Sequence, residues 1–194
     1  AWRGAFYLIL IAMAINFFLS PSGTLLPLLI TKHFQGGVWE LSLIESVSGL
    51  GVVAGGILLG VWGGFRRRVY TTILGVIGIG LGVAFTGMAP AGAFGFAMVG
   101  WTLASLMNPI ANGPLFAIMQ SRVAPEIQGR VFSSIGSLTA AMMPISMLVA
   151  GPVAEIFGIR AWFVVGGVIC VFLGALAFIV PAIKNLESER IPVT

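Results

Sequence analysis

Four residues between positions 101 and 112 carry side chains that can bind a small molecule without reacting with it. They follow one another at intervals of four, three and four residues, which places them on one side of a helix: Trp101, Ser105, Asn108 and Asn112. The indole ring offers an aromatic platform, and the amides and the hydroxyl offer hydrogen-bond donors and acceptors. The pattern predicts a substrate-lining stripe. The alternative is hydrogen bonding between helices, because Pro109 and Pro114 free backbone carbonyls nearby.

Two other places in the sequence offer similar binding chemistry. Asn16 and Ser20 are four residues apart and are accompanied by Phe17 and Phe18, so we expect them to add a second polar and aromatic face to the substrate-lining surface. Met142 stands in a later apolar stretch, where its flexible thioether can adapt to ligands of varied shape. Ordinary packing is the alternative for this methionine.

Glu45 is the acidic residue that lies most clearly inside an apolar stretch. A charged carboxylate deep in a bilayer costs on the order of 3 kcal/mol, so we expect Glu45 to face the interior of a helix bundle and to be protonated part of the time. Competition between a proton and a cationic substrate for this carboxyl group would provide a basis for antiport. The alternatives are that Glu45 reaches the membrane surface or pairs with Lys32. Similarly, we expect Glu155 to pair with Arg160.

A short charged segment separates two of the apolar stretches. Arg122, Glu126 and Arg130 are spaced four residues apart, and a helix that begins at Pro125 brings Glu126 and Arg130 onto one face. We expect this pair to act as a gating latch on the inner side of the membrane that forms in one transport state. The alternative is a solvated ion pair worth at most about 1 kcal/mol.

The reactive residues of the chain argue against an enzyme. The sequence has no aspartate, one histidine and one cysteine, which weakens any metal-site or hydrolase hypothesis. We therefore expect no catalytic residue, no metal ion and no cofactor. The net charge of +4 is explained below by an asymmetry across a membrane, so no nucleic-acid partner is expected.

The elements that carry these residues are predicted to be membrane-spanning helices. Hydrophobic residues make up 58% of the chain, charged residues only 8%, and the mean hydropathy is +1.07, which is typical of proteins in a lipid bilayer. About 20 apolar residues cross a hydrocarbon core of roughly 30 Å. Six segments qualify: Ala5–Ile30, Leu41–Trp62, Val69–Ala89, Gly92–Met119, Arg130–Phe157 and Ala161–Ile183. The expected fold class is an all-α integral membrane protein, with a six-helix transmembrane bundle at residues 1–183 and a cytoplasmic tail at residues 184–194.

The basic residues predict how the bundle is oriented. If the chain begins in the cytoplasm, eight of the ten Lys and Arg residues lie inside: Arg3, Arg66, Arg67, Arg68, Arg122, Arg130, Lys184 and Arg190. Only Lys32 and Arg160 then lie outside, as the positive-inside rule requires. The cluster Arg66–Arg68 is therefore predicted to be a topology anchor, and both chain ends are predicted to be cytoplasmic.

Short internal similarities relate the first three spans to the last three. NFFLSPSGTLLP at 16–27 and NPIANGP at 108–114 each contain an asparagine followed by two prolines, and LGVAF at 81–85 is similar to LGALAF at 173–178. Interrupted helices in corresponding halves are typical of transporters. We interpret the similarities as an inverted 3+3 repeat.

Glycines are spaced four residues apart in the second and third spans, at Gly51/Gly55, Gly56/Gly60/Gly64 and Gly78/Gly82. Small residues at this spacing let helix backbones approach closely in a membrane. Close helix packing is therefore expected, and the same smooth faces would also permit helices to slide or rock.

Three stretches carry a resemblance to a known family: AGGILLGVWGGFRRR at 54–68, VAPEIQGRVF at 123–132 and PISMLVAGPVAEIFG at 144–158. Together they resemble the C-terminal half of major facilitator superfamily transporters, and in particular the drug-exporter branch that includes macrolide efflux permeases. The resemblance covers nearly the whole chain. It implies one bundle of a major facilitator fold, helices 7 to 12 of a twelve-helix transporter, in a bacterial plasma (inner) membrane. The implied partners are an N-terminal six-helix half, a small-molecule substrate and protons.

The sequence and this resemblance lead to one functional expectation and two alternatives. We expect half of a secondary-active transporter that exports amphipathic drugs or other small hydrophobic molecules by alternating access, coupled to protons. One alternative is a transport-dead membrane sensor or scaffold that pairs with other proteins through its glycine-rich faces. The other is a half-size transporter that works as a homodimer.

Overall fold

Six helices make up the part of the chain that the computed structural model describes, residues 3–123 and 125–179: α1 Arg3–Lys32, α2 Val38–Trp62, α3 Arg68–Met88, α4 Phe94–Arg122, α5 Pro125–Phe157 and α6 Ile159–Ile179. Each is long and apolar enough to cross a membrane, which confirms the six predicted spans. Helix α5 begins five residues earlier than its predicted span, because Pro125 can occupy the first helical position, where no N–H is needed. The predicted tail at 184–194, with Lys184 and Arg190, lies outside the described residues.

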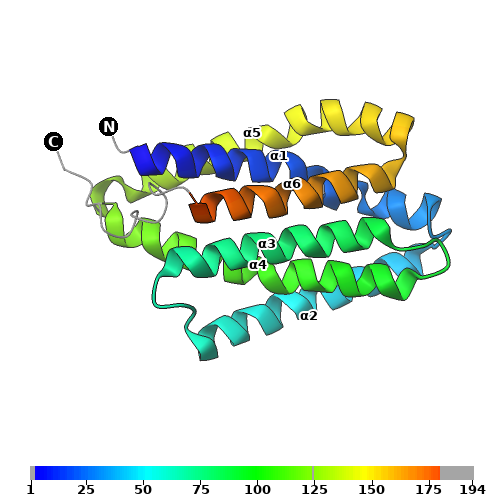
Figure 1. Cartoon of the computed structure of the whole chain (residues 1–194), viewed down its shortest axis with the longest axis horizontal. Coiled ribbons are helices and arrows are strands. Elements are labelled where there is room, and N and C mark those ends of the chain that lie inside the picture. The colour runs from blue at the N-terminus through cyan, green and yellow to red at the C-terminus, as the bar shows by residue number, and fades with distance from the viewer. Residues whose placement is uncertain (1–2, 124, 180–194) are drawn as a thin grey trace.

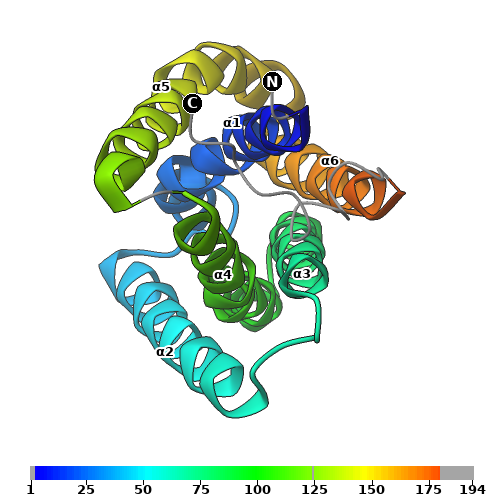
Figure 2. The ribbon, with the colours of Figure 1, turned by 90° about the vertical axis from the view of Figure 1, so that its left-hand side faces the viewer.

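The helices run side by side along the long axis of the molecule (Figure 1). Viewed along that axis, α1 and α4 lie in the middle, α3 and α6 lie together on one side, and α2 and α5 flank the opposite side (Figure 2). Helix α3 packs against α4 and α6, α2 packs against α4, and α1 packs against α5 and α6. The arrangement leaves α1 and α4 between the two flanking helices.

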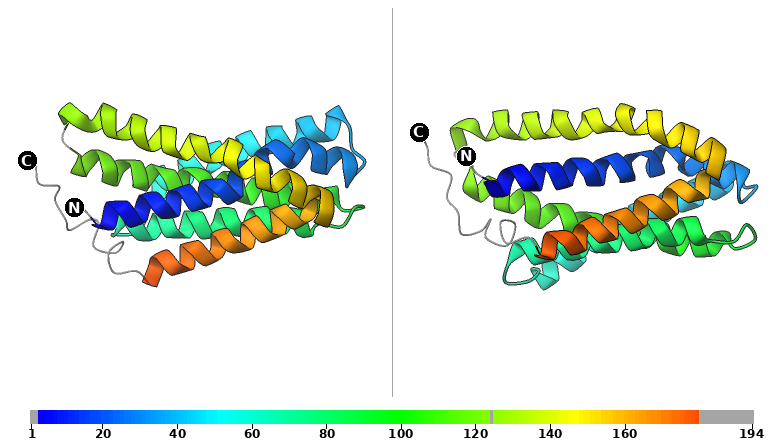
Figure 3. Two further views of the ribbon diagram at one scale, coloured as in Figure 1. Left: turned by 90° about the horizontal axis from the view of Figure 1, so that it is seen from above. Right: turned by 45° about the horizontal axis from the view of Figure 1, so that its top comes forward.

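The helix ends fall into two groups at opposite ends of the bundle. Helix α1 begins, α2 ends, α3 begins and α6 ends at one end, whereas α1 ends, α3 ends and α6 begins at the other (Figure 1). At the second end, α5 turns into α6 through one residue, Gly158, whose φ of 85° favours glycine (Figure 3). The cluster Arg66–Arg68 therefore lies at the same end as the start of α1.

Close glycine contacts hold the bundle together, as the spacing predicts. A Cβ atom at Gly55 of α2 would collide with the backbone carbonyl of Leu106 in α4, and one at Gly75 of α3 would collide with the backbone of Ala111. By contrast, Gly56 and Gly60 have no atom within 4 Å of a Cβ position. The expectation of close packing is therefore confirmed for the Gly51/Gly55 face of α2 and is wrong, within this chain, for Gly56 and Gly60. The third glycine of that predicted set, Gly64, lies in the loop after α2 and packs against Thr71.

The flanking helices carry most of their large apolar side chains on the outside. Leu50 of α2 is 69% exposed and Leu148 of α5 is 78% exposed, whereas Phe163 of α6 and Leu26 of α1 are fully buried. In a bilayer, packing rather than water exclusion holds such buried side chains together. The outer faces of α2 and α5 are therefore open to lipid or to another helical unit.

Candidate ligand-binding site

Six of the predicted substrate-lining residues line one pocket of about 360 Å³ between α1, α3 and α4: Asn16, Ser20, Trp101, Ser105, Asn108 and Asn112. The four-three-four spacing on α4 does place its residues toward α1. Side chains of α3, among them Val76, Ile79 and Val83, also line the pocket. The sequence did not indicate this contribution of α3, because these residues are apolar and resemble ordinary core.

The asparagines keep free hydrogen-bonding groups after their bonds within the helices are made. Asn16 Nδ2 donates to the Ala12 carbonyl at 2.9 Å, and Asn112 Nδ2 donates to the Asn108 carbonyl at 3.0 Å and to Asn108 Oδ1 at 3.3 Å. Among the described residues, Asn16 Oδ1, Asn108 Nδ2 and Asn112 Oδ1 have no protein partner. These asparagines therefore offer amide acceptors at Asn16 Oδ1 and Asn112 Oδ1, and amide donors at Asn108 Nδ2 and at the second N–H of Asn16 Nδ2.

A serine pair fixes one wall of the pocket. Ser105 Oγ donates to the Trp101 carbonyl at 2.9 Å, and Ser48 Oγ of α2 lies 2.7 Å from Ser105 Oγ. Because the single hydroxyl hydrogen of Ser105 is used on Trp101, Ser48 is the donor in the second bond. The alternative of hydrogen bonding between helices near the prolines of α4 also has support, since Pro109 has no N–H to donate to the Ser105 carbonyl. Ser105 thus has an interhelical role as well as a lining position.

The aromatic residues divide between the pocket and the core. Trp101 lines the pocket, and its ring centroid lies 6.3 Å from that of Phe163 in α6. The rings of Phe17 and Phe18 lie 6.4 Å and 6.2 Å from that of Trp162 in α6, and neither phenylalanine lines the pocket. Only Trp101 provides the aromatic platform, and the expected contribution of Phe17 and Phe18 beside Asn16 is corrected to helix packing.

Met142 does not join the other lining residues. It lies half-buried on α5, and α5 packs against α1 and α6 rather than against α4. Residues of α1, α3 and α4 form the pocket. Met142 therefore takes no part in this pocket within the present chain.

Glu45 is exposed on α2 and does not face the bundle interior as expected. The face of α2 that packs on α4 contains Ile44, Ser48, Gly51 and Gly55, and Glu45 lies on a different side of the helix. No ion pair joins Glu45 to Lys32 among the described residues. The carboxyl group therefore points out of this six-helix unit.

The predicted charge pairs are absent from the described residues. Helix α5 does begin at Pro125, which brings Glu126 and Arg130 onto one exposed face, yet no ion pair joins them. Arg160 does not pair with Glu155. Its guanidinium donates instead to the carbonyls of Gly87 at 2.9 Å and Met88 at 3.1 Å, because these carbonyls end α3 without helical partners.

The arginine cluster is exposed at the junction between α2 and α3. Gly63 ends α2 with a φ of 74°, Arg66 lies in the connecting loop, Arg67 precedes the first turn of α3, and Arg68 begins that helix. The Arg67 guanidinium carbon lies 6.0 Å from the centre of the Tyr70 ring, which is at the outer limit of a cation–π contact. The three side chains are thus available to anionic lipid at the bundle end.

Comparison with known proteins shows distant homology to bacterial drug efflux proteins. The chain is 27% identical over 187 residues to macrolide efflux protein A of Streptococcus pyogenes, covering 96% of this chain and 46% of that protein. It is 30% identical over 145 residues to macrolide efflux protein A of Enterococcus faecalis, covering 75% of this chain and 45% of that protein. It is 31% identical over 144 residues to the multidrug efflux pump Tap of Mycobacterium tuberculosis, covering 70% of this chain and 33% of that protein.

The chain spans less than half of the length of these relatives. No protein-family model and no solved structure matches the chain. The chain is thus an integral membrane chain with six candidate spans, and it is distantly related to bacterial efflux proteins.

Proposed function

Starting from this homology to bacterial drug efflux proteins, we propose that the chain is one half of a secondary-active exporter of amphipathic drugs. The observation that carries the proposal is the pocket between α1, α3 and α4, in which six polar or aromatic side chains converge from separate helices. Polar side chains at membrane depth mark substrate pathways when they line a cavity. Because relatives of this chain are named for macrolides, a macrolide is the first substrate to test.

The size of the pocket supports a second half on its open side. A volume of about 360 Å³ is near the lower end of the roughly 300–1,000 Å³ that is typical of ligand sites. It would cover one side of a large drug and leave the other side bare. A six-helix N-terminal unit seated against α2 and α5 would complete the site near the middle of the membrane, and rocking of the two units would give alternating access.

The pairing of helices supports the proposed inverted repeat. In such a repeat, α1 corresponds to α4, α2 to α5 and α3 to α6. Exchanging each helix for its counterpart converts the contact of α1 with α5 into the contact of α4 with α2. The same exchange converts the contact of α3 with α4 into that of α6 with α1, and it leaves α3 with α6 unchanged. All five of these contacts occur in the bundle. Two three-helix units related by an approximate twofold axis would produce these five contacts, whereas the smaller contacts of α5 with α6 and of α1 with α2 have no counterpart of similar extent.

Proton coupling and gating are proposed for charged residues that point out of this unit. Glu45 is exposed on α2, where a carboxyl group facing a partner half can exchange a proton for a cationic substrate. Glu126 and Arg130 are exposed and unpaired with each other in the described part of the chain, so they are free to form a latch in another state. The latch and Arg66–Arg68 are assigned to the cytoplasmic side.

The test is drug export from energised cells that express pocket variants at measured abundance. Asn108→Leu and Trp101→Ala each remove one ligand contact, which should lower macrolide export about fivefold to tenfold. The matched controls are Thr31→Leu, an exposed residue at the end of α1 whose hydroxyl bonds only within its helix, and Phe172→Ala, which is 65% exposed on α6. The controls should export normally.

Two outcomes would reject the proposal. Equal losses of protein and activity in the pocket variants would assign Asn108 and Trp101 to packing. Absence of drug export by the unmodified protein, with normal membrane abundance, would favour the sensor or scaffold alternative, for which the unpacked glycines Gly56 and Gly60 on the outer face of α2 would be the pairing surface.

A further inference from the structure

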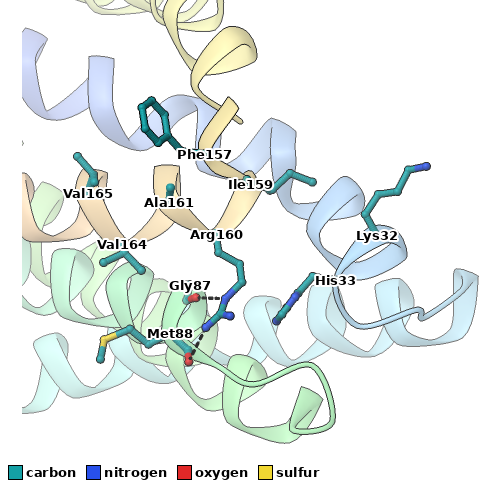
Figure 4. Close-up of a pocket in the computed structure, with 11 residues that line it drawn as sticks. Lys32, His33, Gly87, Met88, Phe157, Ile159, Arg160, Ala161, Val164 and Val165 are labelled. Atoms are coloured by element: carbon teal, nitrogen blue, oxygen red, sulfur yellow. Dashed lines mark hydrogen bonds between the residues drawn. The ribbon is translucent and has the colours of Figure 1, made fainter. Parts of the chain in front are cut away.

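A second pocket lies at the end of the bundle opposite Arg66–Arg68, and it collects the basic residues of that end. Lys32 and Arg160 are the two Lys or Arg residues predicted for this side of the membrane, and both line one cavity of about 760 Å³ together with His33 (Figure 4). Lys32 ends α1 and Arg160 lies in the first turn of α6. Two basic residues separated by 128 positions in the sequence thus line one cavity, although the Lys32 ammonium group points away from the Arg160 guanidinium (Figure 4).

The end of α3 orients two of these side chains. Arg160 Nε donates to the Gly87 carbonyl at 2.9 Å and Arg160 Nη2 donates to the Met88 carbonyl at 3.1 Å (Figure 4). His33 Nε2 lies 3.0 Å from the Ala89 carbonyl, and because a carbonyl only accepts, Nε2 carries the hydrogen. The partial negative charge at the end of α3 is therefore already compensated.

Positive charge remains available in the pocket after these bonds. Arg160 Nη1 and the Lys32 ammonium group have no carboxylate partner among the described residues. No acidic side chain lines the cavity. The beginning of α6, at Ile159 to Ala161, also lines it and adds the positive end of a helix dipole. The local field therefore favours an anion.

The remaining wall of the pocket is apolar. Phe157, Val164 and Val165 line it on the side away from Lys32 (Figure 4). Phe157 is 73% exposed and Val165 is 49% exposed, so these side chains present an open surface. A cationic rim at the helix ends with an apolar wall beside it matches the headgroup and the first part of an acyl chain of a lipid at the membrane surface.

We propose that this pocket binds the phosphate of an anionic phospholipid. Arg160, held in place by the end of α3, contacts the phosphate oxygens, and the Lys32 side chain turns toward the headgroup from the outward orientation that Figure 4 shows. The acyl chain lies along Phe157, Val164 and Val165. A bound lipid would tie together the ends of α1, α3 and α6. The proposal does not depend on drug transport, because lipid binding can be measured without it.

The test is a binding titration of the purified protein with phosphatidylglycerol, phosphatidylcholine and inorganic phosphate, followed by native mass spectrometry. Each neutralised charge should weaken phosphatidylglycerol binding about fivefold, so we expect this loss for Lys32→Gln and again for Arg160→Gln. The control is Arg130→Gln, an exposed arginine of α5 at the opposite end of the bundle, which should bind normally. Phosphatidylcholine binding should be weak and equal in all variants.

Two variants, Lys32→Gln and Arg160→Gln, are used so that the site can still be tested if one of them misfolds. Arg160→Gln removes the bonds to the end of α3 and can lower stability, whereas the Lys32 ammonium group makes no hydrogen bond with another described residue, so Lys32→Gln tests the site alone. Phosphatidylglycerol binding that is equally strong in Lys32→Gln and Arg130→Gln would overturn the site. Displacement of phosphatidylglycerol by inorganic phosphate at similar concentration would overturn the lipid assignment in favour of a free anion.

Discussion

Gly55 of α2 provides a direct test of how closely α2 and α4 pack. A Cβ atom there would lie 2.9 Å from the Leu106 carbonyl carbon and 2.9 Å from Pro109 Cγ, and closer still to the Leu106 oxygen. These neighbours are backbone and a rigid ring, so neither can move aside on its own. At Gly56, the next residue, a Cβ atom would meet nothing within 4 Å. The two positions therefore form a matched pair.

The expected magnitude follows from the difference between Gly55→Ala and Gly56→Ala. Replacing glycine by alanine stabilises a helix by roughly 1 kcal/mol at either position, so this contribution cancels. What remains is the overpacking at Gly55, which costs about 1–3 kcal/mol. Since the contact is with backbone, we expect the upper part of this range, with the Gly55 variant about 2 kcal/mol less stable than the Gly56 variant.

Reversible unfolding in mixed dodecyl maltoside and sodium dodecyl sulfate micelles would measure this difference. The free energy of unfolding should fall for Gly55→Ala, and it should stay level or rise for Gly56→Ala. Equal free energies for the two variants would refute the close α2–α4 contact and with it the wall that Ser48 and Ser105 form.

Three further predictions test other parts of the account. Ser105→Ala removes the interhelical bond from Ser48 and should lower the free energy of unfolding by about 0.6 kcal/mol in the same micelles. The control Ser46→Ala, whose hydroxyl bonds only within α2, should leave the free energy of unfolding unchanged. Equal losses for the two variants would count against the interhelical bond. Glu45→Gln should abolish efflux driven by a proton gradient while drug binding persists, because the amide cannot exchange a proton; full gradient-driven efflux would exclude an essential coupling role. Arg67→Cys should react with a membrane-impermeant thiol reagent only after cells are permeabilised, and reaction in intact cells would reverse the proposed orientation.

The sequence predicts the helices well because hydrophobic length alone determines them. All six spans occur, and the Gly51/Gly55 face of α2 packs as its spacing indicates. The polar stripe on α4 is also readable from the sequence, since residues at intervals of three and four must share a face. These features depend on helical periodicity and on nothing farther along the chain.

Helical periodicity does not predict which helices pack against each other, so most features that depend on that packing could not be predicted from the sequence. Glu45 was expected inside because a charge avoids lipid, yet the rotation of α2 is set by Ile44, Gly51 and Gly55, which pack on α4. The contact of Ser48 with Ser105 could have been predicted, since Ser48 lies on the same face of α2 as these packing residues. The shared pocket of Lys32 and Arg160 had no signal in the sequence, because it requires α1 to end and α6 to begin beside α3.

Protection of a pocket cysteine by substrate would show whether the pocket between α1, α3 and α4 binds the drug. Asn108 is exposed to the pocket, whereas the native cysteine, Cys170, is buried, so Asn108→Cys should be the reactive position toward a thiol reagent. A macrolide should slow labelling at position 108 and leave unchanged the labelling of Val168→Cys, which is 56% exposed on α6. Undiminished labelling at position 108, under conditions in which the same protein exports the macrolide, would contradict the assignment of this pocket to the substrate.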